Sequence, residues 1–205
     1  MKYLIAALVF AFSSSINAAP IKLFNTGVDD AGALLSAGSA DPHYTVFESG
    51  APAQVIDGIP SSYAPNGPDS QWIWQFASGA PTFVTRTFRT TFDLTGFDHT
   101  TAMINGLWGT DNEGLDILIN GISTGNSLLG ITVDNFSSLH AFDITSGFQA
   151  GLNTIDFVIS DSGVVSGFRA ELSGTAEVVP EPSIIALMAA GLAGLGFARR
   201  RARTQ

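Results

Sequence analysis

The stretch Phe83-Val-Thr-Arg-Thr-Phe88-Arg-Thr-Thr-Phe92 is built largely from aromatic and β-branched residues. Successive side chains of a β-strand point to opposite faces of the sheet. Phe88 and Phe92 therefore share one face, which we expect to look into a core. Between residues 19 and 175 no apolar pattern with a period of about 3.6 residues persists. The stretch thus predicts a half-buried strand within an all-β body.

Similar short runs recur along the rest of the body, separated by Gly, Pro, Asn and Asp. Asn120 and Gly121 follow one such run and are the pair most typical of a tight hairpin turn. Ten short strands in about 155 residues favour a two-sheet antiparallel β-sandwich or jelly roll over a closed barrel. The expected strands cover residues 21–25, 43–48, 54–56, 71–76, 83–93, 101–108, 115–119, 140–144, 153–160 and 165–173.

The composition limits the classes of partner and of chemistry. Charged residues make up 13% of the chain and hydrophobic residues 45%, which argues against a disordered protein. Residues 19–180 hold 4 Lys and Arg against 17 Asp and Glu, a net charge of −13, so we expect no nucleic acid among the partners. The absence of cysteine excludes disulfides, thiolate nucleophiles and cysteine-bound metals.

The N-terminus has the pattern of a secretory signal. Lys2 supplies a basic start, residues 4–12 form an unbroken apolar run, and small residues follow. The apolar run is too short to span a bilayer of about 30 Å as a helix. We therefore expect residues 1–18 to be a signal peptide that signal peptidase removes after Ala18.

The C-terminus combines three features in a fixed order. Pro180-Glu181-Pro182 interrupts the chain, residues 183–198 are apolar, and Arg199-Arg200-Arg201 follows. At about 1.5 Å per residue the apolar segment makes a helix of about 24 Å, which is short for permanent anchorage. The arginines favour a cytoplasmic end. Residues 177–205 are thus expected to hold the body transiently on the outer side of the inner membrane.

This tripartite order resembles the PEP-CTERM sorting signal of Gram-negative bacteria that produce exopolysaccharides. The resemblance implies cleavage near Pro180-Glu181-Pro182 by an exosortase, a membrane cysteine protease. It also implies delivery to the cell surface or the extracellular matrix. A plain C-terminal membrane anchor is the alternative that the residues alone allow.

The body carries a second resemblance, to the extracellular β-sandwich commonly found ahead of PEP-CTERM tails. That sandwich is similar to the galactose-binding-like jelly rolls of carbohydrate-binding modules. The resemblance implies a single domain over residues 19–176, and it implies a fold and a location more than an activity. The landmarks that carry it lie at residues 24–30, 41–44, 70–73, 87–94, 108–112, 117–121 and 151–157.

Tryptophan indicates where a sugar could stack, because the C–H face of a sugar packs on an indole. Trp108 stands beside a polar loop, and Asp111 and Asn112 in that loop offer hydrogen bonds to hydroxyls. We therefore expect these three residues to bind a ligand, with a polysaccharide as the partner. Trp72 and Trp74 share one strand face and are either a stacking platform or part of the core.

Calcium is the metal that best suits an acidic, cysteine-free body, because it takes six to eight oxygen ligands from irregular loops. Asp29, Asp30 and Asp41 crowd one early segment, and residues 111–116 form a second acidic group. We expect the early segment as the site of a structural Ca²⁺, of the kind that galactose-binding-like domains often carry. Ordinary turns capped by aspartate are the alternative.

Catalytic signals are weaker. Residues 121–125 match the G-x-S-x-G nucleophile elbow, which requires a helix directly after the serine, and no helix is expected there. His43, His99 and His140 lack metal-ligand spacing. We therefore expect a non-catalytic surface or matrix protein that acts by adhesion or glycan contact. The alternatives are a glycan-active hydrolase that uses loop carboxylates and a structural matrix protein without a specific ligand.

Overall fold

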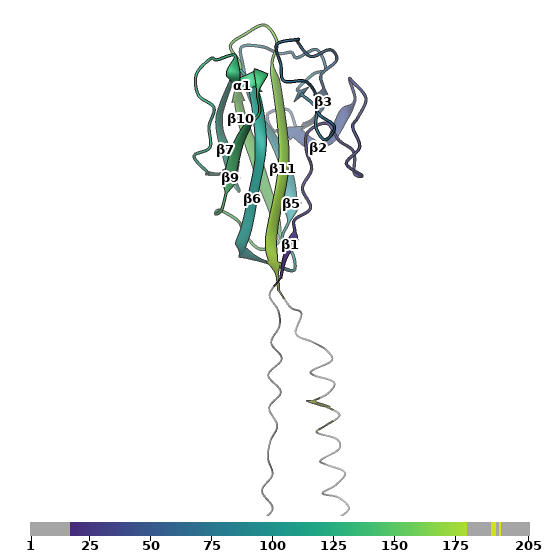
Figure 1. Cartoon of the computed structure of the whole chain (residues 1–205), viewed down its shortest axis with the longest axis vertical. Helices are drawn as coiled ribbons and strands as arrows, with labels where there is room; N and C mark the ends of the chain where they lie inside the picture. Colours follow the sequence, from purple (N-terminus) through teal and green to yellow (C-terminus); the bar gives the residue numbers. More distant parts are fainter. Residues whose placement is uncertain (1–16, 180–189, 192, 194–205) are drawn as a thin grey trace, which may run out of the picture.

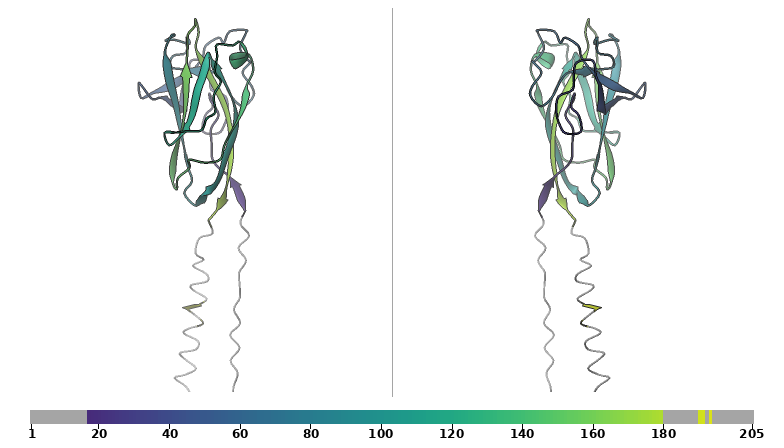
Figure 2. Two further views of the ribbon diagram at one scale, coloured as in Figure 1. Left: turned by 90° about the vertical axis from the view of Figure 1, so that its left-hand side faces the viewer. Right: turned by 90° about the vertical axis from the view of Figure 1, so that its right-hand side faces the viewer.

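The computed structural model describes residues 17–179, 190, 191 and 193. Residues 17–179 form a two-layered antiparallel β-sandwich (Figure 1, Figure 2). This architecture confirms the all-β prediction. The elements are β1 (Ala18–Pro20), β2 (Ala40–Val46), β3 (Ala51–Val55), β4 (Ile73–Trp74), β5 (Thr85–Asp93), β6 (Phe97–Asp111), β7 (Glu113–Ile119), β8 (Ile122–Ser123), α1 (Asp134–Ser137), β9 (His140–Ile144), β10 (Leu152–Ser160) and β11 (Gly167–Val178).

The strands follow one hydrogen-bonded path in the order β8-β7-β10-β5-β2-β3-β4-β11-β6-β9, and β1 pairs with β11. β7, β10 and β5 lie in one layer, and β11, β6 and β9 lie in the other (Figure 2). The short strands β3 and β4 join the two layers along one side. From β5 onward, consecutive long strands therefore alternate between the layers, so each connection runs from one layer to the other.

Aromatic side chains from both layers meet in the core. Phe168 of β11 lies between Phe88 of β5 and Phe157 of β10, with ring centroids 5.1 and 4.7 Å apart. Phe157 in turn contacts Trp108 of β6 at 5.9 Å, and Phe88 contacts Trp74 at 5.1 Å. All five side chains are buried. Phe88 and Phe92 both face inward, as the alternation over residues 83–92 predicts.

The strand predictions hold best where the alternation is clear. Residues 140–144 form β9 with the predicted bounds, and Asn120 and Gly121 make the predicted turn with φ of 51° and 78°. Residues 21–25 form no strand, although the Ile21 amide still bonds the Gly174 carbonyl at 2.9 Å. The sequence predicted neither β8 nor α1. Both are too short to show a period in the sequence.

The two ends of the body meet at one pole of the sandwich (Figure 1). β1 pairs with the end of β11, with Ala18 opposite Glu177, and the Val179 amide bonds the Gly96 carbonyl at 2.9 Å. Residues 190, 191 and 193 are helical. No helix in the described part of the chain is long and apolar enough to cross a membrane. Residues 1–16 of the expected signal peptide (residues 1–18) and most of the expected sorting helix lie outside the described residues.

Replacement of Trp108 by alanine tests the core. The indole contacts the rings of Phe142 and Phe157, and Gly114 lies against its face. We expect Trp108→Ala to lower the free energy of unfolding by about 3 to 5 kcal/mol, because it leaves a large cavity. Met103→Ala is the control, since Met103 is on the same strand and exposed. Equal stability of the two variants in urea titrations would contradict this packing.

Candidate functional site

The structure places all three tryptophans in the core, and this corrects the predicted role of Trp108. Trp108 is 1% exposed and Trp72 and Trp74 are fully buried. The indole N–H groups of Trp72 and Trp74 donate to the carbonyls of Ala64 and Pro81 at 2.8 and 3.0 Å. A buried indole has no face on which a sugar could stack. Trp74 and Trp108 pack against Phe88 and Phe157 of the other layer, whereas Trp72 packs on Tyr63 and covers Gly109 and Gly167 of β6 and β11.

Asp111 and Asn112 are also buried, so they offer no surface to a ligand. The Tyr63 hydroxyl donates to Asp111 Oδ2, and Asn112 Nδ2 donates to Asp111 Oδ1 at 2.6 Å. Asn112 Oδ1 accepts from the backbone amide of Ser162 at 2.7 Å. The predicted ligand residues therefore join three loops that are distant in sequence. Sequence alone could not show this, because Tyr63 lies 48 residues from Asp111.

A second buried carboxylate, Asp161, lies near Asp111. Asp161 Oδ2 accepts from the Phe83 amide at 2.7 Å, whereas its Oδ1 is buried without a partner. Burial raises the pKa of Asp111, and the charge of Asp161 raises it further, whereas hydrogen bonds from Tyr63 and Asn112 lower it. The balance favours the protonated form of Asp111 more than in an exposed aspartate.

The predicted calcium residues do not converge. Asp29 Oδ1 accepts from the amides of Ala31 and Ala33, both at 2.9 Å. Asp41 is buried and accepts from three backbone amides, including that of Gly27 at 2.7 Å. The Asp30 carboxylate lies 3.7 Å from His43 Nε2. Within the described residues no group of three acidic or histidine side chains could hold a metal. Asp29 and Asp41 act as turn anchors, the alternative that the sequence allowed.

The G-x-S-x-G match also lies in a turn. Ser123 ends β8, and its hydroxyl accepts a hydrogen bond from the Gly125 amide at 3.2 Å. The chain continues without a helix until α1. A nucleophile elbow needs a helix directly beneath the serine, so the motif carries no hydrolase chemistry here.

A groove lies on the outer face of the β9-β6-β11 layer and has a volume of about 650 Å³. Its floor consists of side chains that point away from the core on three neighbouring strands. The segment before and after Asn25, together with Asp69, forms the wall. The polar and apolar side chains that line the groove include Asn25, Asp69, Asn105, Leu107, Asp143 and Glu171.

The groove combines an apolar floor with groups that can form hydrogen bonds. Leu107 is 37% exposed at the floor. Within residues 17–179 the carboxylates of Asp69 and Asp143 form no hydrogen bond or ion pair, and both residues are exposed. Ser173 Oγ donates to Asn105 Oδ1 at 2.8 Å and so orients the Asn105 amide. A polar ligand with an apolar face would suit this surface.

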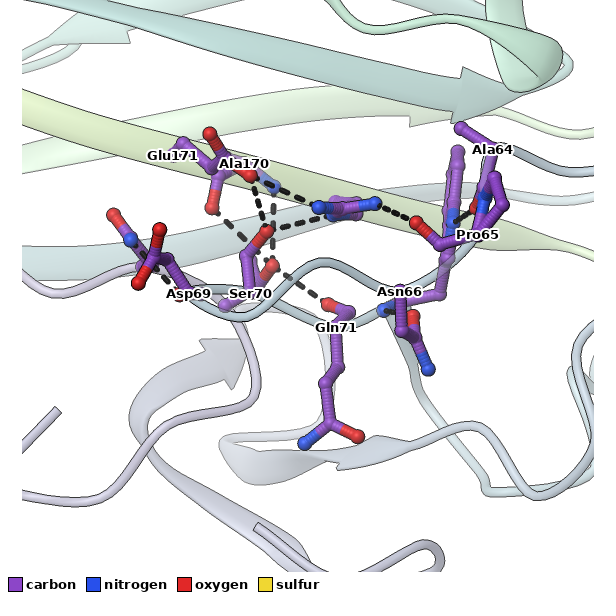
Figure 3. A network of polar contacts seen from close by, with 12 residues as sticks. Ala64, Pro65, Asn66, Asp69, Ser70, Gln71, Ala170 and Glu171 are labelled. Atoms are coloured by element: carbon purple, nitrogen blue, oxygen red, sulfur yellow. Dashed lines mark hydrogen bonds and ion pairs between the residues drawn. The ribbon is translucent and has the colours of Figure 1, made fainter. Parts of the chain in front are cut away.

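A network of buried contacts fixes the wall of the groove (Figure 3). Arg169 is buried between β11 and the loop before β4, and its guanidinium donates to Ser70 Oγ at 2.6 Å and to Glu171 Oε1 at 2.9 Å. It also donates to the Pro65 carbonyl. Burial lowers the pKa of Arg169, and the charge of Glu171 opposes that effect. Arg169 thus ties the loop before β4 to β11 and leaves the groove with a rigid side.

The groove residues were missed in the sequence because they come from separate strands. Asn105 and Leu107 were within a predicted strand, and so was Asp143. Strand alternation identifies their outward faces, but only the pairing of β6 with β9 and β11 brings those faces together. Strand alternation was the one available signal, and it does not specify which residues of neighbouring strands lie opposite each other.

The pH dependence of stability tests the environment of the buried Asp111 carboxyl group. A raised pKa in the folded state favours folding at low pH, and this stabilisation is lost as the pH rises through the raised value. As the pH falls from 7 toward the ordinary aspartate pKa of 3.8, we therefore expect the unfolding free energy of the native protein to increase relative to that of Asp111→Asn.

Asp93→Asn is the opposite control. Hydrogen bonds from Thr95 lower the pKa of the exposed Asp93. The unfolding free energy of the native protein should therefore decrease relative to that of this variant as the pH falls through the lowered value. Denaturant titrations at several pH values measure both differences. Parallel pH profiles of native protein and Asp111→Asn would show that Asp111 is not perturbed.

No curated protein and no solved structure matches the chain. The galactose-binding-like class of the sandwich therefore stays a prediction. At the C-terminus, residues 178–202 match the PEP-CTERM protein-sorting motif. The match begins at Val178, the last residue of β11, so the motif follows the folded body without a linker. The chain carries a PEP-CTERM sorting motif, and this supports an exported protein that an exosortase processes.

Proposed function

We propose that the protein is a non-catalytic β-sandwich of the cell surface or extracellular matrix, and that it contacts polysaccharide through the groove. The observation that carries this proposal is the groove itself, with Leu107 at its floor and the free carboxylates of Asp69 and Asp143 beside it. Sugars present hydroxyls around an apolar ring, so such a surface can bind both parts of a sugar unit.

The position of the groove supports this role. Glu171 and Ser173, which line the groove, lie midway along β11, whereas the sorting motif begins at the end of that strand. The two ends of the body, β1 and the last residues of β11, lie together at one pole (Figure 1). While the sorting helix holds the body to the inner membrane, the groove would thus lie on the flank of the sandwich. After processing, the same flank would stay open to the matrix.

Binding to matrix polysaccharide tests the groove. We expect Leu107→Ala to weaken retention of the full chain, solubilised in mild detergent, by about tenfold, because it removes roughly 1.4 kcal/mol of apolar contact. Met103→Ala is the matched control, since Met103 is exposed on the same face of the same strand outside the groove. Affinity electrophoresis in gels that contain the polysaccharide measures both variants.

Two outcomes would replace the proposal. Release of reducing ends from the polysaccharide would favour the glycan-active hydrolase. Absence of retention with every polysaccharide of the producing cell would favour a structural matrix protein without a specific ligand. An equal effect of Leu107→Ala and Met103→Ala would place the binding surface elsewhere.

Processing at the sorting motif has its own test. We expect the intact mass of protein recovered from the cell surface to lack the arginine cluster at residues 199–201, because the exosortase cuts near Pro180-Glu181-Pro182. We expect replacement of Glu181 by alanine to leave the uncut chain in the membrane fraction. Surface protein that retains residues 199–205 would contradict processing and would favour the plain membrane anchor.

A further inference from the structure

We infer that the groove selects glycans with free amino groups, such as a partly deacetylated hexosamine polymer, over neutral and acidic glycans. This inference rests on the proposed function, because it names the ligand class of the same site. Three observations carry it: the hydrogen-bonding groups that remain free in the groove, the position of the nearby cations, and the charge of the whole body.

The free groups of the groove are mainly acceptors. The carboxylates of Asp69 and Asp143 have no partner within residues 17–179. Glu171 uses Oε1 for Ser70 and Arg169, and within the same residues its Oε2 has no hydrogen-bond partner. An ionised carboxylate only accepts, whereas an ammonium group offers three donors. A donor-rich ligand therefore satisfies this surface better than an acceptor-rich one.

The neighbouring cations do not cancel these charges. The Arg169 guanidinium is 4% exposed, and Glu171, Ser70 and the Pro65 carbonyl engage it between β11 and the loop before β4. Lys22 lies over the Phe24 ring, with its Nζ 4.9 Å from the ring centroid, and it does not line the groove. The negative charge on the open side comes from Asp69 and Asp143, which approach a ligand from the wall and from the floor.

The charge of the body acts in the same direction. Residues 19–180 carry a net charge of −13, so a uronic acid polymer is repelled before it reaches the groove, whereas an amine-bearing polymer is attracted. The floor spans three strands about 4.8 Å apart, which gives a surface about 10 Å wide. Such a surface can hold neighbouring units of a chain, with one amine near each carboxylate.

Oligosaccharides of equal length test this selectivity. The full chain, solubilised in mild detergent, is titrated with glucosamine, N-acetylglucosamine and galacturonate oligomers at pH 6. We expect the glucosamine oligomer to bind about tenfold more tightly than its N-acetylated form, which matches about one charge contact near the surface. That difference should shrink as salt rises from 50 to 500 mM. Galacturonate should not bind.

Asp143→Asn isolates the charge contact, because it keeps the shape of an exposed side chain. It should weaken binding of the glucosamine oligomer severalfold, because Asp69 keeps part of the preference, and it should leave binding of the N-acetylated form unchanged. Asp57→Asn is the matched control, since Asp57 is exposed outside the groove and makes the same change in net charge. Thermal unfolding confirms that both variants are folded.

The outcomes separate this inference from the proposed function. Equal affinity for the amine-bearing and N-acetylated oligomers, or equal losses for both on Asp143→Asn, would overturn the amine selectivity and leave glycan binding intact. Preference for galacturonate would overturn the selectivity and the charge argument together. If neither oligomers nor matrix polysaccharide bind, both the inference and the proposed function fail.

Discussion

Contact between aromatic rings of the two layers is the constraint on which the rest of the structure depends. The chain has no cysteine, so no disulfide joins the layers. Phe168 lies between Phe88 and Phe157, and Trp108 extends the contact across β6. Burial of each large aromatic side chain contributes a few kcal/mol, and offset rings add to that. From β5 onward, consecutive long strands alternate between the layers. Loss of this contact would therefore leave the two layers joined only by the connecting segments.

Buried polar groups supplement the core where the loops meet. Arg169 fixes the loop before β4, and Tyr63 fixes the turn between β6 and β7 through Asp111. A buried charge is costly unless it is paired, and removal of one partner costs more than the pair contributes. These contacts therefore restrict the loops to one arrangement. The wall of the groove inherits its rigidity from Arg169, which binds both Ser70 and Glu171.

Local pattern predicted the strands well, and non-local pairing decided the site. Alternation over residues 83–92 placed Phe88 and Phe92 correctly, because a period of two needs no knowledge of partners. Trp108 was assigned to a ligand because polar residues follow it, yet Phe142, Phe157 and Gly114 enclose it. Residues of the groove meet only through strand pairing, which a single sequence does not specify. The sorting motif could be recognised without knowledge of the fold, because it is defined by the order of residues along the chain.

The acidic character of the body now has a structural interpretation that composition alone did not provide. Most carboxylates near the turns bind backbone amides, as Asp29 and Asp41 do, and so serve the fold. The carboxylates of Asp69 and Asp143 have no partner within residues 17–179, and both residues line the same groove. Unpaired charges on a rigid wall and floor cost little while water solvates them, and they interact strongly once a ligand displaces that water. Under the proposed function, the same net charge that argues against a nucleic-acid partner would discriminate among polysaccharides.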